Sequence, residues 1–398
     1  MTRPMHGFPP LAADQVTLAN WREPPFNRWA FQHVRELLPT AAIENEPQSV
    51  AEWKLSSVDT LDWHVDDAER QAMSFAQFLD KSASDAIVIV HRGRIVFEHS
   101  APGSSTLTPH ILMSVSKSML GLVAEILIAR KDLDPSRTVV DILPELGATA
   151  YADATVRNLL DMRAGIHFDE DYAATEGPIV DYRKATGWNP LQKGEEASDL
   201  RSFFRLMSRP DPPHGGKFHY VSPNSDLLGW LIERATGTRF AGLMSELLWR
   251  PLGASRSGYV TVDRFGAPRC AGGICVCARD LALVGQLLLD DGARAGKQIL
   301  PAGWVDDLLR NGDQAAWASG SFVDYFPGRA MHYRSQWYVE NEPNALLFAV
   351  GIHGQNLFVD PARQLVIAKV SSQATPLDLR DIALTLRAVS TVQRGLAE

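Results

Sequence analysis

Hydrophobic positions near both ends of the chain follow strand-like patterns. DAIVIVHRGRIVFEHS contains two β-branched runs separated by HRG, with Gly93 supplying the turn. Near the other end, ALLFAVGIHGQNLFVDPARQLVIAKVSS indicates three strands joined by short turns, and LDLRDIALTLRAVSTVQRGL follows as an amphipathic helix. Strands from both ends are expected to pair in one antiparallel sheet, because this satisfies their edges, with the terminal helices covering one face.

The remaining pattern is mostly helical. DDAERQAMSFAQFLD predicts a helix from about Asp66 to Asp80, with acidic residues at its start. Residues 111–310 are expected to form a mainly helical lobe beside a sheet lobe made of residues 61–110 and 311–398. Residues 1–60, rich in Pro, Trp and polar positions, are expected to wrap over this body. The fold class is therefore α/β in the broad sense (α+β), with a cleft between lobes as the default place for a site.

Composition narrows the classes of function. With 398 residues the chain can bury a large core, and its net charge of -8 argues against nucleic-acid binding. The longest apolar run, from Met119 to Ala129, carries Glu125 and falls short of a membrane span. The first residues show neither an apolar run nor a cleavage site for export. We expect a cytoplasmic protein that binds neither membranes nor nucleic acid.

The three cysteines lie together in RCAGGICVCARD. Cys275 and Cys277 are two residues apart, but no second cluster of Cys or His offers the paired spacing of a zinc site. We expect Cys270, Cys275 and Cys277 to be buried thiols, as in a reducing compartment. No metal or cofactor is expected.

Candidate chemistry appears in SVSK. Only Ser114 stands three residues before Lys117, so on a helix these two side chains share a face and Ser116 does not. A lysine that is partly buried beside an apolar helix has a lowered pKa and can take the proton of a serine hydroxyl. A short motif of this kind also arises by chance at a solvated helix start, so its context has to decide.

Two further segments supply that context. In KFHYVSPNSDLLGWLIERATG, Tyr220 and Asn224 stand where a long apolar helix begins, which ends at Gly237. Tyr220 is either a proton carrier or a packed aromatic residue with a satisfied hydroxyl. If it carries protons, we expect Lys117 to favour its phenolate form. AVGIHGQN is a strand with two glycines, which admits either a substrate along the backbone or a bulge.

Together the three segments resemble the class C β-lactamase and penicillin-binding-protein-like serine hydrolases in order and spacing. The likeness extends through VRNLLDMRAGI, PLGAS and CARDLALVGQLLLDDG and covers roughly residues 60–390. REPPFNRWAFQHVRELLPTA, LMSVSKS, HYVSPN and GIHGQNLFVDP are similar to the 6-aminohexanoate-dimer hydrolases, a nylon-oligomer branch with carboxylesterase activity. The resemblance implies a β-lactamase-like fold and a serine hydrolase that forms an acyl-enzyme.

The resemblance also implies roles for individual residues. Ser114 would be the nucleophile, Lys117 its base partner and Tyr220 the proton donor and acceptor, with the N–H groups of Ser114 and Ile352 as the oxyanion hole. The positions expected to bind substrate are Tyr172, Asp181, Arg183, Asn224, Ala271, Trp337 and His353.

Two departures from the relatives bear on the substrate. Penicillin-directed relatives carry a lysine in a K-T-G-type strand, whereas this strand reads AVG or IHG. In the loop DYAATEGPIVDYRKATGW, Arg183 stands where efficient nylon-oligomer members place a carboxylate, although Asp181 is close by, and Ala271 replaces a polar residue. We expect esters to be good substrates, nylon-type amides weaker ones and penicillins negligible ones.

Other classes fit less well. The G-x-S-x-G elbow of α/β-hydrolases and the H-E-x-x-H motif of metallohydrolases are both missing from the sequence. A β-lactamase or D-alanyl-D-alanine-type peptidase on the same fold, and a non-catalytic binding module, remain as alternatives. The catalytic set speaks against the binding module, and the missing lysine and export signal speak against the cell-wall enzymes. A small-molecule ester or amide is the expected partner, and a homodimer is left open.

Overall fold

A computed structural model describes residues 4–58, 63–208, 213–341, 343 and 345–396 of the chain. Its main sheet has eight strands, antiparallel except for one parallel pair at the edge. In spatial order these are β12 (Met331–Arg334), β13 (Trp337–Glu340), β14 (Leu346–Gly351), β15 (Gln355–Asp360), β16 (Leu365–Ser371), β5 (Ser84–His91), β6 (Arg94–Ser100) and β2 (Lys54–Leu55). The predicted union of strands from both ends is confirmed, because β16 pairs with β5 along its length.

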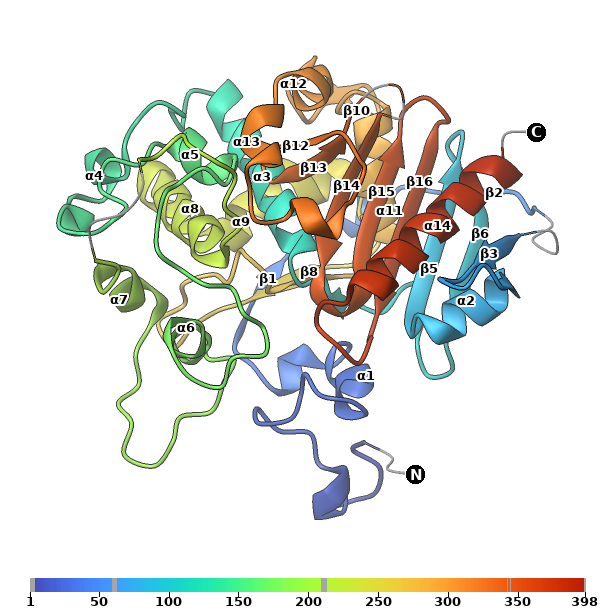
Figure 1. Cartoon of the computed structure of the whole chain (residues 1–398), viewed down its shortest axis with the longest axis horizontal. Helices are drawn as coiled ribbons and strands as arrows, with labels where there is room; N and C mark the ends of the chain where they lie inside the picture. Colours follow the sequence, from blue (N-terminus) through green and yellow to red (C-terminus); the bar gives the residue numbers. More distant parts are fainter. Residues whose placement is uncertain (1–3, 59–62, 209–212, 342, 344, 397–398) are drawn as a thin grey trace.

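Helices cover both faces of this sheet (Figure 1). On one face, α14 (Leu379–Gly395) packs its apolar side with Phe348, Phe358 and Ile367. On the other, α11 (Ala278–Leu289) and α3 (Val115–Ala129) pack with strand residues such as Val88 and Val366. Because both faces are buried, β5 is a continuous apolar run rather than an alternating one.

The middle of the chain is mainly helical but holds a second sheet that the sequence analysis did not predict. This sheet has the order β1 (Thr40–Ile43), β8 (Gly258–Thr261), β9 (Ile274–Val276) and β7 (His110–Ile111). The helices of this part are α4 (Val139–Ile142), α5 (Val156–Leu160), α6 (Pro178–Ala185), α7 (Leu200–Arg205), α8 (Ser222–Thr236), α9 (Phe240–Met244) and α10 (Arg250–Leu252). Since α3 and α11 pack on the main sheet, the division into two lobes stays a prediction.

Short elements complete the fold. Two hairpins are formed by β3 (His64–Asp66) with β4 (Ala72–Ser74) and by β10 (Ala293–Arg294) with β11 (Lys297–Gln298). The remaining helices are α1 (Phe26–Ala30), α2 (Phe75–Lys81), α12 (Trp304–Arg310) and α13 (Gln314–Ala318), with several single turns between them and a π-helical turn at Ser245–Trp249.

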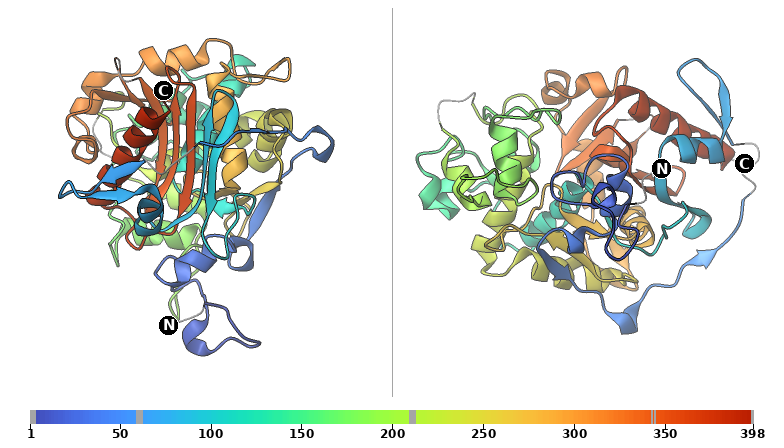
Figure 2. Two further views of the ribbon diagram at one scale, coloured as in Figure 1. Left: turned by 90° about the vertical axis from the view of Figure 1, so that its right-hand side faces the viewer. Right: turned by 90° about the horizontal axis from the view of Figure 1, so that it is seen from below.

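The N-terminal segment, dark blue in Figure 2, packs against residues 111–113, just before Ser114. Trp21 and Phe31 are fully buried in a small core that also contains Ile111, Met113 and Trp188. The Phe31 carbonyl accepts from Ile111 N at 2.9 Å, and Trp21 Nε1 donates to the Trp188 carbonyl at 3.0 Å. The segment therefore builds one wall of the site described below.

The helix predicted from Asp66 to Asp80 is wrong over its first half. Asp66 ends β3, and the Asp67 carboxylate accepts from two following backbone N–H groups and forms a turn. The helix begins only after Ser74, which caps it through a hydrogen bond from Gln77 N. Local side-chain bonds to the backbone here compete with helix formation.

Two other expectations concern the thiols and membranes. All three cysteines are buried free thiols, as predicted, although Cys277 caps α11 instead of lying on β9. Within the described residues, no helix has the length and apolar character needed to cross a membrane.

Candidate active site

Ser114 lies at the junction between the small sheet and helix α3. Leu112 N donates to the Ile274 carbonyl at 2.8 Å, which fixes the chain just before the serine. Met113 then adopts a left-handed conformation with φ of 45°, rare for a residue with a side chain. Ser114 follows as the N-cap residue of α3, and its side chain makes no capping hydrogen bond. Its hydroxyl is thus free to face the cavity.

Lys117 is the partner of this hydroxyl. Lys117 Nζ lies 2.9 Å from Ser114 Oγ, 3.0 Å from Ser222 Oγ and 2.9 Å from the Ala271 carbonyl oxygen. The side chain is buried, and burial lowers the pKa of Lys117 to about 7, with the Glu170 carboxylate opposing this shift. A large fraction of the amine is therefore neutral near pH 7, with a lone pair available for the serine proton.

Tyr220 completes the catalytic set just before α8. Its ring centroid lies 4.8 Å from Lys117 Nζ, and hydrogen bonds from Ser114 and Tyr338 favour its phenolate. Burial outweighs them and, with the Glu170 carboxylate, raises the pKa of Tyr220 well above its ordinary value. The expectation that Lys117 favours the phenolate is therefore wrong, because burial outweighs the neighbouring groups that lower the pKa of Tyr220. The raised pKa keeps Tyr220 a neutral phenol near pH 7.

Strand β14 passes very close to the backbone of the serine. It ends at Gly351, where a Cβ would lie 2.9 Å from Ser114 N and 2.6 Å from the Leu112 carbonyl oxygen. Only glycine allows the strand to approach Ser114 this closely. The next residue, Ile352, lines the same cavity as Ser114. Two N–H groups at one end of a cavity can stabilise the negative charge of a tetrahedral intermediate.

The cavity at Ser114 measures about 420 Å³ with its solvent-open part. It contains charged, aromatic and apolar side chains from both the N-terminal segment and the central part of the chain. Its lining residues are Arg22, Met113, Ser114, Glu170, Tyr172, Ile179, Tyr182, Arg183, Trp188, Ser222, Arg269, Ala271, Gly272 and Ile352. Tyr172, Arg183 and Ala271, which the sequence analysis expected to bind substrate, are thus brought together with the nucleophile.

Four other expected binding residues do not line this cavity. Asn224 is fully buried and accepts from the Tyr151 hydroxyl at 2.9 Å. Trp337 is fully buried in the main core, and His353 bonds through Nδ1 to the Gln373 carbonyl at 2.7 Å. Asp181 is exposed on α6. The four residues lie outside the cavity lining, and their contact with substrate stays a prediction.

Glu170 and Ser222 are site residues that the sequence analysis missed. The Glu170 carboxylate accepts from Ser222 N at 2.5 Å, from the Ser222 hydroxyl and from the Tyr172 hydroxyl at 3.0 Å. Ser222 Oγ in turn contacts Lys117. Ser222 follows Tyr220 by two residues at the start of α8, and it is this residue, not the predicted Asn224, whose side chain contacts Lys117.

A buried ion pair beneath the cavity holds Ala271. Arg269 pairs with Asp226, and the Tyr182 hydroxyl also donates to Asp226. The other oxygen of Asp226 accepts from Ala271 N at 2.7 Å. This bond holds the backbone at Ala271, and the carbonyl oxygen of the same residue accepts a hydrogen bond from Lys117. The ion pair therefore positions the base partner through the backbone.

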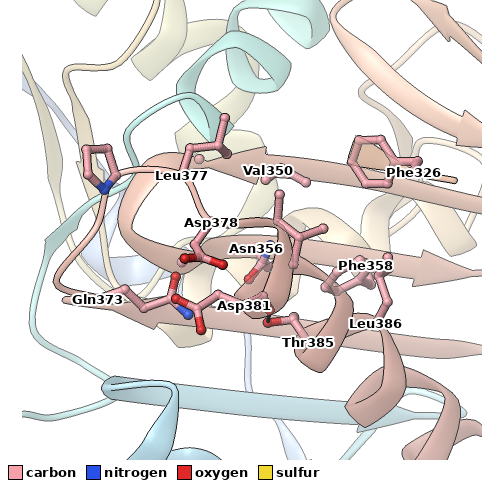
Figure 3. A pocket seen from close by; sticks show the side chains of 14 residues that line it. Phe326, Val350, Asn356, Phe358, Gln373, Leu377, Asp378, Asp381, Thr385 and Leu386 are labelled. Carbon is pink, nitrogen blue, oxygen red and sulfur yellow. Dashed lines mark hydrogen bonds between the residues drawn. The ribbon is translucent and has the colours of Figure 1, made fainter. Parts of the chain in front are cut away.

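A different cavity lies between α14 and the main sheet (Figure 3). Asn356, Gln373, Asp378 and Asp381 point toward one another there, and Gly351 lines it. Its lining residues include no serine, cysteine or lysine, and the hydroxyl of Thr385 donates to the Asp381 backbone carbonyl. Among the described residues, no group of three or more His, Cys, Asp and Glu side chains is arranged to hold a metal ion. The Ser114 cavity is accordingly the candidate active site.

Comparisons with known proteins agree with this geometry. The family model described as Beta-lactamase matches residues 71–391. A 6-aminohexanoate-dimer hydrolase of Paenarthrobacter ureafaciens is 34% identical over 369 residues, which cover 93% of this chain and 91% of that protein. A Bacillus anthracis structure provisionally named 6-aminohexanoate-dimer hydrolase aligns with a TM-score of 0.88 and 26% identity over 98% of both chains. A family VIII carboxylesterase shares the fold, with a TM-score of 0.59 and 17% identity over 80% of this chain and 95% of its own.

The first prediction distinguishes Ser114 from Ser116 as the nucleophile. Ser114→Ala should lower kcat for 4-nitrophenyl acetate by roughly 10⁴-fold or more, because the nucleophile is lost. Ser116→Ala is the matched control: its hydroxyl accepts from Ile274 N at 3.1 Å, away from the cavity. That variant should lose about 1–3 kcal/mol of stability, measured by urea unfolding, and keep most of its activity. Equal losses of activity in both variants would contradict the assignment.

The second prediction follows from the two pKa shifts. Lys117 must be neutral to act as a base, so kcat/KM for a neutral ester should rise about tenfold per pH unit below pH 7 and level off above it. No fall should follow up to about pH 9, because the raised pKa of Tyr220 keeps its phenol protonated. Lys117→Arg should abolish the rise. A wild-type profile that is flat from pH 5 to 9 would be inconsistent with Lys117 as the base.

Proposed function

The chain belongs to the beta-lactamase family and is a hydrolase of that fold, and we propose that it cleaves short linear carboxylic esters and amides through an acyl-enzyme on Ser114. The observation that carries this proposal is the buried contact of 2.9 Å between Lys117 Nζ and Ser114 Oγ. The named activity of the Paenarthrobacter relative supports the choice of a linear amide or ester over a β-lactam.

Acylation uses the three side chains in sequence. Neutral Lys117 takes the hydroxyl proton while Ser114 Oγ attacks the substrate carbonyl carbon. The N–H groups of Ser114 and Ile352 stabilise the resulting oxyanion. Tyr220 donates its phenolic proton to the departing alcohol or amine and is reprotonated by the Lys117 ammonium. The result is an ester of Ser114 and a free alcohol or amine.

Deacylation repeats these steps with water. Lys117 is neutral again after acylation and takes a proton from the incoming water, which attacks the acyl carbon. The oxyanion forms in the same position, and as the bond between Ser114 Oγ and the acyl carbon breaks, Oγ takes the phenolic proton of Tyr220, which the Lys117 ammonium then reprotonates. The products are a carboxylic acid and the original enzyme. Glu170 takes no proton in this scheme, because its carboxylate accepts hydrogen bonds from Ser222 and Tyr172 and holds them beside the base.

We place the enzyme in the cytoplasm, where its three buried free thiols suit a reducing environment. A β-lactamase or a D-alanyl-D-alanine-type peptidase on the same fold would be the second candidate. Penicillin-directed relatives bind a substrate carboxylate through a lysine on the strand beside the oxyanion hole. The corresponding strand here reads AVG or IHG and has no lysine in either register. No side chain at that strand favours the second candidate.

The third prediction concerns the substrate. Wild type should hydrolyse 4-nitrophenyl acetate well, the linear 6-aminohexanoate dimer slowly and nitrocefin negligibly. Arg183 lies in the cavity and repels the ammonium end of the dimer, and a charge-assisted bond lost there corresponds to about one to two decades in rate. Arg183→Asp combined with Ala271→Asn should therefore raise kcat/KM for the dimer relative to that for the acetate.

Steady-state kinetics on the three substrates checks this prediction, with Ser114→Ala as the background control. Nitrocefin as the best substrate would favour the second candidate. Dimer hydrolysis by wild type at the rate of the ester would contradict the role given to Arg183.

A further inference from the structure

Two arginines line the Ser114 cavity without a carboxylate partner. Arg22 comes from the N-terminal segment and Arg183 from α6, and both contribute to the cavity wall. Within the described part of the chain, neither guanidinium has a carboxylate oxygen within 4.0 Å, whereas Arg269 in the same cavity is paired with Asp226. Buried or half-buried arginines are normally paired, so two without partners at a binding site need an explanation.

One short segment links the Arg22 side chain to the backbone of Arg183. Arg22 donates to the side-chain oxygen of Asn189, and Asn189 N donates to the Arg183 carbonyl at 3.2 Å. Arg183 itself donates from Nη2 to the Tyr172 carbonyl at 3.2 Å. Each guanidinium therefore has a neutral oxygen that fixes its position and several N–H groups left for a ligand.

The other charges around the cavity are already engaged. The Glu170 carboxylate is occupied by donors from Ser222 and Tyr172. Asp226 is taken by Arg269, and Lys117 has a pKa of about 7. The Glu170 carboxylate keeps its negative charge and partly opposes the lowering of the Arg183 pKa, so Arg22 and Arg183 together leave the cavity with more positive than negative unpaired charge.

The pKa shifts of the two arginines also favour a bound anion. Burial lowers the pKa of Arg22 to about 9, and the positive charges of Arg183 and Arg269 lower it further than the Glu23 carboxylate restores. Burial also lowers the pKa of Arg183. An anion bound between the two guanidinium groups would relieve both the mutual repulsion and the loss of water.

We propose that Arg22 and Arg183 bind a carboxylate at the end of the substrate's acyl chain, the end at which the 6-aminohexanoate dimer carries an ammonium, so that the enzyme acts on esters or amides whose short aliphatic acyl group ends in an acid. Met113, Ile179 and Ile352 in the same cavity offer apolar contacts to such a chain. Arginine presents paired N–H donors that match the two oxygens of a carboxylate. The inference rests on the proposed function, because it names the substrate class of the Ser114 site.

Matched ester pairs test this proposal. Mono-4-nitrophenyl adipate and its methyl ester differ only in a carboxylate on the acyl side, and 6-acetoxyhexanoate and its methyl ester differ in the same way on the alcohol side. The ratio of kcat/KM for charged over neutral ester should be about 10 or more in wild type for the adipate pair and close to one for the acetoxyhexanoate pair. High salt should reduce the ratio.

Variants locate the source of the preference. Arg22→Gln and Arg183→Gln should each lower the ratio by about five- to tenfold, and the double variant should bring it near one. Arg22→Lys and Arg183→Lys should keep part of it, because the charge remains. Arg310→Gln is the control for net charge, since Arg310 is exposed on α12 and pairs with Asp306, and it should keep the wild-type ratio.

A binding measurement separates this inference from the proposed function. Calorimetry on the Ser114→Ala protein should show monomethyl adipate binding at least about tenfold more tightly than dimethyl adipate, and Arg22→Gln should remove the difference. Such binding without turnover of any ester by wild type would uphold the anion site and refute the proposed function. Turnover with a ratio near one for the adipate pair, and equal binding of the two adipates, would overturn the anion site and leave the proposed function standing.

Discussion

The contact between the Lys117 amine and the Ser114 hydroxyl depends on the absence of water around the lysine. An exposed lysine would be an ammonium at neutral pH and could not accept a proton. Here the side chain is buried under Ser222 and Ala271, and its pKa falls to about 7. Burial of a cation is costly, and three hydrogen-bond acceptors around Nζ offset part of that cost. The surrounding fold excludes water from this amine and holds it in place.

Two parts of the chain distant in sequence support that environment. The Arg269–Asp226 pair fixes the Ala271 peptide that faces the lysine. The N-terminal segment packs Trp21 and Phe31 against Met113, and so holds the strained residue before the nucleophile. Strand β14 then approaches Ser114 so closely that position 351 must be glycine. The Arg269–Asp226 pair, the N-terminal segment and strand β14 thus meet around Ser114 and together hold it in place.

Local pattern was enough to predict strands β5, β6, β14, β15 and β16 of the main sheet and the pair Ser114 and Lys117, because both depend on spacing within a few residues. Strands β2, β12 and β13 of the same sheet were not predicted. The small sheet was missed because its strands are two to four residues long and two of its three pairings join residues more than 160 positions apart. Glu170 was missed for the same reason, since its role comes from contacts with Ser222, 52 residues away. The phenolate expected at Tyr220 failed because burial, which spacing cannot reveal, dominates its pKa.

The central claim, that Ser114 becomes acylated, is tested most directly by mass spectrometry of the enzyme quenched during turnover of a slow ester. The account predicts an increase in intact mass equal to the acyl group, located by fragmentation on Ser114 within the peptide that ends at Lys117. An adduct on Ser116 or on any other side chain, or rapid turnover with no adduct even at the lowest temperatures and shortest times, would contradict it.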